Sequence, residues 1–176
     1  MDKLKVLIVD DHQMIVDGIK QLINSTEKCE VVAVANNGQE ALEVLKILSV
    51  DLILMDIDMP IMNGLDASIK IKKDYPKTRI IILSMHSEYG MIKDLLEIGV
   101  DGYLLKNSSK TELETAINQM INGGKYFASE LTQNLLNKDK NKSPKSSIAL
   151  TKREHEILIC IADGFTNKEI GDKLFI

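Results

Sequence analysis

The strongest constraint on the fold of this 176-residue chain is a regular alternation of two hydrophobic patterns. Short apolar runs bounded by turn residues are separated by longer stretches in which apolar residues recur every three or four positions. The short runs are continuously apolar, which is typical of parallel strands that are buried on both faces. Five strands are predicted, at residues 4–9, 31–34, 52–55, 80–83 and 102–105.

Helical periodicity occupies the segments between these strands. It is clear at residues 14–23, 41–48 and 92–98. A capping box from Ser109 to Glu112 begins a further helix, which Gly123 and Gly124 end. The alternation predicts an α/β fold with a doubly wound, five-stranded parallel sheet, in which right-handed crossovers bring the carboxyl ends of all strands to one edge.

Composition limits the class of protein. With 44% hydrophobic and 27% charged residues, the chain can form one sizeable core and a small second domain. No apolar stretch approaches the roughly 18 residues of a membrane span, and no signal peptide precedes the first strand, so we expect a cytoplasmic protein with no membrane partner. The distant Cys29 and Cys160, with no histidine at ligand spacing, argue against a disulfide framework or a zinc site.

Polar side chains follow four of the predicted strands. Asp10 and Asp11 follow the first strand, Asp56 the third, Ser84 the fourth and Lys106 the fifth. Because these strand ends share one edge of the sheet, we expect the side chains to converge on one site. Three carboxylates at close range repel one another, so a cation is expected among them. Mg²⁺, which prefers carboxylates, a backbone carbonyl and water, fits this requirement.

Each of these residues also has a plain structural interpretation. Asp10 and Asp11 could cap the following helix, and Ser84 could be an ordinary loop residue. Lys106 could be a solvated surface charge, and Tyr103 a half-buried residue of the sheet. Their coincidence at one edge of the sheet favours a shared functional site.

In combination, these motifs resemble the receiver domain of two-component response regulators. The resemblance covers residues 3 to about 124, and we predict a receiver domain over residues 1–124. The matching residues are Asp10-Asp11, Asp56 with Met59-Pro60 and Gly64, Ser84, and Tyr103-Leu104-Leu105-Lys106. The resemblance implies a CheY-like fold, Mg²⁺ as cofactor and a sensor histidine kinase as the partner that supplies a phosphoryl group.

The resemblance also implies a role for each residue of the site. Asp56 would accept the phosphoryl group, and Lys106 would pair first with Asp56 and then with that group. Asp11 would ligate Mg²⁺ directly and Asp10 mostly through water. Asp56 itself and the backbone carbonyl of Asp58 would complete the metal site.

Four more side chains are expected to act around the phosphoryl group. Ser84 would donate to a phosphoryl oxygen, and Tyr103 would change its position as the switch. The side chains of Asp58 and His86 would lie at the mouth of the site and tune how readily water reaches the aspartyl phosphate. The switched surface would control homodimerisation, through either the face of the first helix and fifth strand or the face of the fourth helix, fifth strand and fifth helix.

Two alternative functions remain open. The stretch LILMDIDMP also resembles the nucleophile motif of haloacid-dehalogenase-type phosphatases, which pass through a phosphoaspartate. That family has Thr or Val two residues after the second Asp, where this chain has Pro60, and its motif usually follows the first strand. The other alternative is a receiver that acts as a stand-alone interaction module.

The remainder of the chain predicts a linker and part of a second domain. Residues 125–149 contain a short, weakly helical pattern and then a lysine-rich stretch with Ser143-Pro144, which is typical of a charged linker. Residues 150–176 hold two capping boxes, at 151–154 and 166–169, with Gly164 between them. This pattern predicts two short helices.

These C-terminal residues resemble the opening of the LuxR-type helix-turn-helix domain of NarL/FixJ regulators. In that family the helix that enters the major groove follows the helix predicted here. We therefore expect this chain to be the N-terminal portion of a longer transcription regulator. No DNA-binding residue is predicted in this fragment, and promoter DNA is expected as a partner of the full-length protein alone.

Overall fold

A computed structural model of the whole chain describes residues 3–85, 89–128, 157, 160 and 165–174. The chain divides into two compact units, Met1–Asn137 and Lys138–Ile176. Within the described ranges, no helix is both long enough and apolar enough to cross a membrane.

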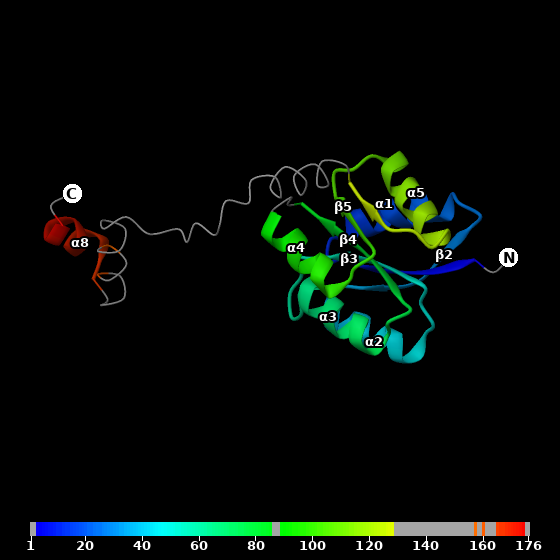
Figure 1. Cartoon of the computed structure of the whole chain (residues 1–176), viewed down its shortest axis with the longest axis horizontal. Helices are drawn as coiled ribbons and strands as arrows, with labels where there is room; N and C mark the ends of the chain where they lie inside the picture. Colours follow the sequence, from blue (N-terminus) through cyan, green and yellow to red (C-terminus); the bar gives the residue numbers. More distant parts are fainter. Residues whose placement is uncertain (1–2, 86–88, 129–156, 158–159, 161–164, 175–176) are drawn as a thin grey trace. The chain divides into compact units, whose positions relative to one another are not determined.

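The first unit is a parallel sheet with helices between successive strands (Figure 1). The strands are β1 (Leu4–Val9), β2 (Cys29–Ala35), β3 (Leu52–Asp56), β4 (Arg79–Ser84), β5 (Gly102–Leu105) and β6 (Tyr126–Phe127). The helices are α1 (Gln13–Asn24), α2 (Gly38–Ile47), α3 (Gly64–Asp74), α4 (Tyr89–Ile98) and α5 (Lys110–Ile121). The strand order is β2-β1-β3-β4-β5-β6, and all neighbours pair in parallel. This arrangement confirms the predicted doubly wound α/β fold.

The helices cover both faces of the sheet, with α1 and α5 on one face and α2, α3 and α4 on the other (Figure 1). Successive residues of a strand point to opposite faces, so β3 contributes Leu52 and Leu54 to the core under α1 and α5. Its residues Ile53 and Met55 pack under α2, α3 and α4. Burial on both faces explains why the strands are continuously apolar in sequence.

The sheet has six strands, and the prediction of five is wrong by one. Residues 126 and 127, which the linker prediction included, form β6 and pair in parallel with Gly102 and Tyr103 of β5. Gly102 permits the close approach, because a Cβ there would lie 2.9 Å from the backbone oxygen of Tyr126. A two-residue strand is too short to show a hydrophobic period, which is why the sequence pattern did not reveal it.

Side-chain caps begin three of the helices. Asn37 accepts a hydrogen bond from the backbone of Glu40 at the start of α2, and Asn63 caps α3 in the same way. The capping box predicted at Ser109 is present at the start of α5. Helix α1 differs, because its N-cap residue His12 makes no side-chain capping bond. The His12 ring is therefore available for contacts elsewhere.

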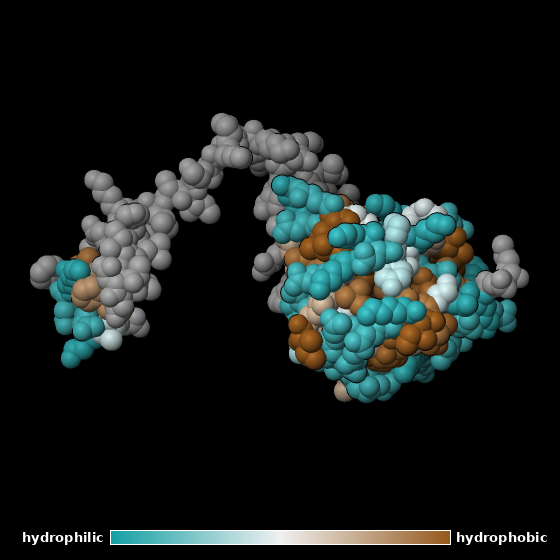
Figure 2. Space-filling model, turned by 90° about the horizontal axis from the view of Figure 1, so that it is seen from below, coloured by the Kyte–Doolittle hydropathy of each residue, from teal (hydrophilic) through white to brown (hydrophobic). Residues whose placement is uncertain are grey.

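The face of the first unit that α2 and α3 cover carries small apolar patches among polar side chains (Figure 2). Ile47 at the end of α2 is 82% exposed, and Ile69 on α3 is 48% exposed. Single exposed apolar residues of this kind are common on protein surfaces.

In the second unit, the structure describes helix α8 (Asn167–Leu174). Thr166 and Glu169 form the predicted capping box, in which the backbone N–H of Thr166 donates to Glu169 Oε2 at 2.8 Å. Ile170 is buried in this unit. The first predicted helix of this unit, within residues 151–163, lies outside the described residues except at positions 157 and 160.

Candidate functional site: an acidic pocket at the carboxyl edge of the sheet

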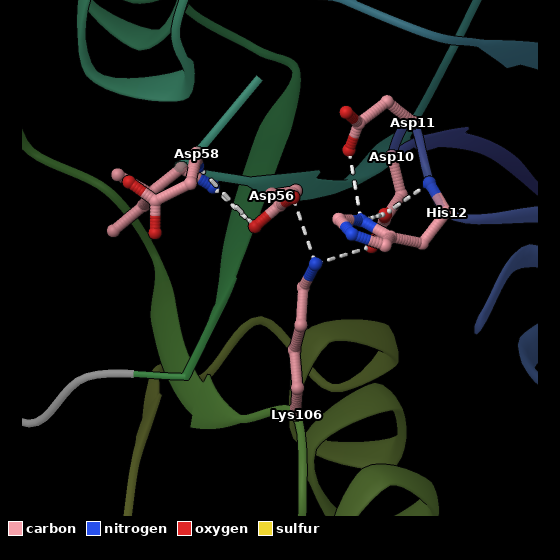
Figure 3. A network of polar contacts seen from close by, with 7 residues as sticks. Asp10, Asp11, His12, Asp56, Asp58 and Lys106 are labelled. Atoms are coloured by element: carbon pink, nitrogen blue, oxygen red, sulfur yellow. Dashed lines mark hydrogen bonds and ion pairs between the residues drawn. The ribbon is translucent and has the colours of Figure 1, made fainter.

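The carboxyl ends of β1, β3 and β5 bring charged side chains together (Figure 3). Asp10 and Asp11 follow β1, Asp56 is the last residue of β3, and Lys106 follows β5. The backbone N–H of Lys106 donates to the carbonyl of Ser84 at 2.8 Å, which fixes the end of β5 against the end of β4. Neighbouring parallel strands therefore bring residues that are up to 96 positions apart into one pocket.

Lys106 lies between two buried carboxylates. Its Nζ is 2.8 Å from Asp10 Oδ2 and 2.7 Å from Asp56 Oδ2. The exposed fractions of the Lys106, Asp10 and Asp56 side chains are 4%, 1% and at most 2%. Among the described residues, these two carboxylate oxygens have no hydrogen-bond partner beyond this ammonium group. Because charges are costly to bury unpaired, Lys106 is required for both aspartates to be ionised in this position.

The Asp56 carboxylate is held by its own backbone as well as by Lys106. Its Oδ1 accepts a hydrogen bond of 2.7 Å from the N–H of Ile57 and a longer one of 3.4 Å from the N–H of Asp58. Burial raises the pKa of Asp56 above its usual range. The hydrogen bond from Lys106 lowers this pKa, the charge of Asp10 raises it, and the net direction is upward.

Lys106 stays protonated in this environment. Burial on its own lowers the pKa of the Lys106 ammonium, but the hydrogen bonds and charges of Asp10 and Asp56 outweigh burial. The net pKa of Lys106 is above its ordinary value. The pocket therefore presents a fixed positive charge next to the Asp56 carboxylate.

His12 also lies in the pocket, although the sequence pattern predicted no role for it. Its Nδ1 lies 2.8 Å from Asp11 Oδ1 and 3.2 Å from Asp10 Oδ1, and its backbone N–H donates to Asp10 Oδ1 at 2.9 Å. Figure 3 shows the ring turned toward both carboxylates. A signal was present in the sequence, because a histidine that directly follows an Asp pair at a helix start can reach both acids.

The donor atoms of the pocket are suited to a divalent cation. Asp10, Asp11, His12 and Asp56 each offer one ligand atom, and these atoms all lie within 4.8 Å of one another. The carboxylates of Asp10 and Asp56 are buried. Among the described residues, Lys106 is the only partner of one oxygen of each. Carboxylate oxygens are the ligands that hard divalent cations prefer. The pocket can therefore hold a metal ion.

Ser84 and Tyr103, the two predicted switch residues, are both fully buried and hydrogen-bonded to each other. Burial raises the pKa of Tyr103, the hydrogen bond with Ser84 lowers it, and the charge of Asp58 raises it further. Asp58 itself is exposed, whereas His86, predicted to lie beside it, falls outside the described residues. In this structure the ring of Tyr103 already lies in the interior.

Gly64 explains how the loop after β3 closes beside the pocket. Its N–H donates to the carbonyl of Ile57 at 2.9 Å, and a Cβ at Gly64 would lie 2.0 Å from the backbone oxygen of Asp56. Ile61, earlier in the same loop, has a φ of 67°, a left-handed conformation that is uncommon for a branched residue. The glycine is therefore required for Asp56 to take its observed position.

Replacing Asp56 with asparagine is expected to raise the free energy of unfolding at neutral pH. Because the folded state raises the pKa of Asp56, it binds a proton more tightly than the unfolded state does. The free energy of unfolding therefore falls as pH rises from the ordinary carboxyl pKa through the raised one. Asp56→Asn removes this dependence. Urea unfolding of both proteins across the acidic and neutral range measures the difference.

The control is Asp17→Asn, at an exposed position on α1, which should change the free energy of unfolding by no more than about 0.5 kcal/mol at any pH. A less stable Asp56→Asn variant with an unchanged pH dependence would contradict the upward direction of the Asp56 pKa.

Comparisons with known families agree with this fold. Residues 6–118 match the family described as "Response regulator receiver domain". Residues 148–176 match "Bacterial regulatory proteins, luxR family". These two matches cover both units of the chain.

Known proteins and solved structures are similar over nearly the whole chain. The transcriptional regulatory protein DegU of Brevibacillus brevis is 32% identical, over 99% of this chain and 81% of that protein. The oxygen regulatory protein NreC of Staphylococcus epidermidis is 36% identical, over 98% and 84%. A structure of two RcsB dimers bound to two parallel DNAs has a TM-score of 0.72 and 26% identity, over 98% of this chain and 83% of that chain.

A structure of the RcsB response regulator of Salmonella typhimurium, solved in a study of DNA interaction, has a TM-score of 0.72 and 25% identity. It covers 99% of this chain and 84% of that chain. The chain therefore belongs to the response regulators of two-component systems that combine a receiver domain with a LuxR-type DNA-binding domain.

Proposed function

We propose that Asp56 accepts a phosphoryl group from a sensor histidine kinase, with Mg²⁺ in the acidic pocket, and that phosphorylation switches the surface of the receiver domain. The observation that carries this proposal is the Lys106 ammonium, 2.7 Å from Asp56 Oδ2 inside a pocket of three carboxylates. A buried carboxylate beside a fixed cation is a nucleophile for phosphoryl transfer whose new charge is neutralised in advance.

In the proposed transfer, a bond forms between a carboxylate oxygen of Asp56 and the phosphorus atom. The bond from phosphorus to the histidine nitrogen of the kinase breaks, and that nitrogen keeps the electron pair. Lys106 then pairs with an oxygen of the phosphoryl group. Since Ile57 N–H already holds Asp56 Oδ1, the carboxylate enters the reaction with its orientation fixed.

Asp10, Asp11, Asp56 and the backbone carbonyl of Asp58 would hold Mg²⁺. The bound ion would neutralise negative charge on the phosphoryl oxygens. Asp11, which is exposed, would contact it directly, and the buried Asp10 mostly through water. The hard oxygen donors of these residues support this assignment.

The hydrogen bond between Ser84 and Tyr103 supports a route for the switch. Phosphorylation places about two negative charges beside Ser84, whose hydroxyl would turn to donate to a phosphoryl oxygen. Tyr103 would then lose its buried partner, which favours a different position of the ring and of the surface around β5. Asp58 and His86 would tune the access of water to the aspartyl phosphate.

We assign residues 1–124 to the receiver, 125–149 to a linker and 150–176 to the LuxR-type domain. Phosphorylation would promote a homodimer, and promoter DNA would be the partner of the full-length protein. The similarity to RcsB, which has been solved as dimers bound to DNA, supports both partners. The kinase is the partner that a receiver domain implies.

The experiment is incubation with Mg²⁺ and acetyl phosphate, followed by electrophoresis in a gel that retards phosphoproteins. Wild type should shift, Asp56→Ala should not, and the control Asp17→Ala should shift as wild type does. Turnover of a generic phosphomonoester, which would indicate a phosphatase, should be absent. An unmodified wild type, or a shift that persists in Asp56→Ala, would rule out Asp56 as the acceptor.

A further inference from the structure

Strand β6 ties the chain that leaves α5 to β5, the strand that carries Tyr103. The backbone N–H of Tyr126 donates to the carbonyl of Asp101 at 3.0 Å. The backbone N–H of Ala128, the residue after β6, donates to the carbonyl of Tyr103 at 3.3 Å. We call residues 126–128 the β6 clamp. The clamp is therefore hydrogen-bonded to β5 at both of its ends.

The Asp101 end of the clamp is anchored by a network of its own. The Asp101 carboxylate accepts a hydrogen bond of 2.9 Å from the backbone N–H of Ile80 and forms a partly buried ion pair with Lys72. The backbone N–H of Asp101 donates to the carbonyl of Ile80 at 2.9 Å. Because its side chain and its main chain are both held, Asp101 presents its carbonyl to Tyr126 in a fixed position.

The other end of the clamp depends on Tyr103. The bond of 3.3 Å from Ala128 is slightly longer than the roughly 2.7–3.2 Å of most N–H···O hydrogen bonds. Ala128 is buried in the same core cluster as Tyr103. The side chain of Tyr103 is in turn hydrogen-bonded to Ser84. Tyr103 therefore connects the clamp, through its carbonyl, with Ser84, through its hydroxyl.

A movement of Ser84 toward a phosphoryl group would loosen the Tyr103 end of the clamp. A buried hydroxyl that loses its hydrogen-bond partner is costly, so the Tyr103 ring would leave its observed position. Ala128 would then lose part of the core in which it is buried, and the carbonyl that it binds would shift with β5. A short element with few backbone bonds belongs to the least stable parts of a fold, so a small shift is enough to open it.

We propose that the β6 clamp couples the phosphorylation site to the chain that leads to the second unit. Phosphorylation of Asp56 opens the bond between Ala128 and Tyr103. The bond between Tyr126 and Asp101 remains and acts as a hinge. The inference rests on the proposed function, because the switch must respond to the phosphoryl group. It adds the element through which that response leaves the receiver domain.

Amide hydrogen exchange of the whole chain, followed by nuclear magnetic resonance, measures the two ends of the clamp separately. Beryllofluoride with Mg²⁺ serves as the phosphoryl mimic at Asp56. Its addition should lower the protection of the Ala128 amide at least about 10-fold and that of the Tyr126 amide less than about 2-fold. Asp56→Ala lacks the carboxylate that holds beryllofluoride and should show neither change.

Coupling between two sites is reciprocal, so opening the clamp should strengthen binding at Asp56. Ala128→Pro removes the N–H donor and should raise the affinity for beryllofluoride about 5-fold, measured by calorimetry. The control Ala128→Ser keeps the donor and should bind within about 2-fold of wild type. The resonance spectrum of each variant reports whether it is folded. If Ala128→Pro does not fold, the exchange measurement on wild type decides the outcome.

The outcomes separate this inference from the proposed function. Protection of Ala128 that is unchanged or higher in the beryllofluoride complex overturns the inference and leaves the phosphorylation site intact. Equal losses at Ala128 and Tyr126 overturn the hinge. A folded Ala128→Pro variant with unchanged affinity identifies the clamp as a passive cover of the sheet edge, and also overturns the inference. Wild type that does not bind beryllofluoride overturns both the proposed function and the inference.

Discussion

Replacing Lys106 with methionine should lower the rate of phosphorylation by about 100-fold or more and destabilise the receiver domain by about 3–5 kcal/mol. The ammonium group is 2.8 Å from Asp10 Oδ2 and 2.7 Å from Asp56 Oδ2, and all three side chains are almost completely buried. Methionine preserves the volume but leaves two buried carboxylates without their cation. Urea unfolding and the initial rate of acetyl phosphate modification measure the two effects.

The matched control is Lys110→Met. Lys110 is 62% exposed and pairs with Glu114 on the surface of α5 at 3.7 Å, so its loss should cost no more than about 0.5 kcal/mol. Adding Asp56→Asn to Lys106→Met removes one of the two unpaired charges, so stability should partly return, while the loss of the acceptor abolishes phosphorylation. If Lys110→Met and Lys106→Met destabilised the protein equally, burial of the Lys106 pairs would not be the cause.

The convergence of the site could be predicted from the sequence because the fold enforces it. Asp10, Asp56 and Lys106 each stand at the carboxyl end of an apolar run, and parallel strands place all such ends on one edge. This prediction needs the strand type and the end of each run, both of which the hydrophobic pattern supplies. It needs no knowledge of side-chain rotamers.

The pairing within the site could not be predicted in the same way. The resemblance implied that Lys106 pairs with Asp56, but in the structure its ammonium also contacts Asp10 at 2.8 Å. The direction of the His12 ring could not be predicted either, because it depends on a side-chain torsion. With this torsion the ring does not cap α1. Contacts of this kind are decided by rotamers and local charge, which strand periodicity does not encode.

The short strand β6 was missed for a different reason. Residues 126–127 pair with β5 through backbone hydrogen bonds, and the approach depends on the absence of a side chain at Gly102. The bond from Tyr126 N–H to the carbonyl of Asp101 begins the pairing. Backbone pairing over two residues leaves no periodic trace in the sequence, so the same residues were predicted as the start of a linker.

Substituting alanine for Gly64 should destabilise the protein by about 3 kcal/mol and slow phosphorylation about 100-fold. The new Cβ would lie 2.0 Å from the backbone oxygen of Asp56, 2.9 Å from its carbonyl carbon and 3.0 Å from Ile57 Cα. All three are backbone atoms, so no side-chain rotation relieves the overlap. The end of β3 must move, and the Asp56 carboxylate moves with it away from Lys106. Urea unfolding and the rate of acetyl phosphate modification test both parts.

The matched control is Gly18→Ala on α1. A Cβ at Gly18 would meet no atom within 4 Å, and alanine in a helix is favoured over glycine, so this variant should be more stable by about 0.5–1 kcal/mol and be phosphorylated normally. If the free energy of unfolding falls in Gly64→Ala and rises in Gly18→Ala, the loss of stability at Gly64 comes from the contact with Asp56. If Gly64→Ala kept full stability but lost phosphorylation, the loop would be adaptable and the glycine would position the nucleophile without supporting the fold.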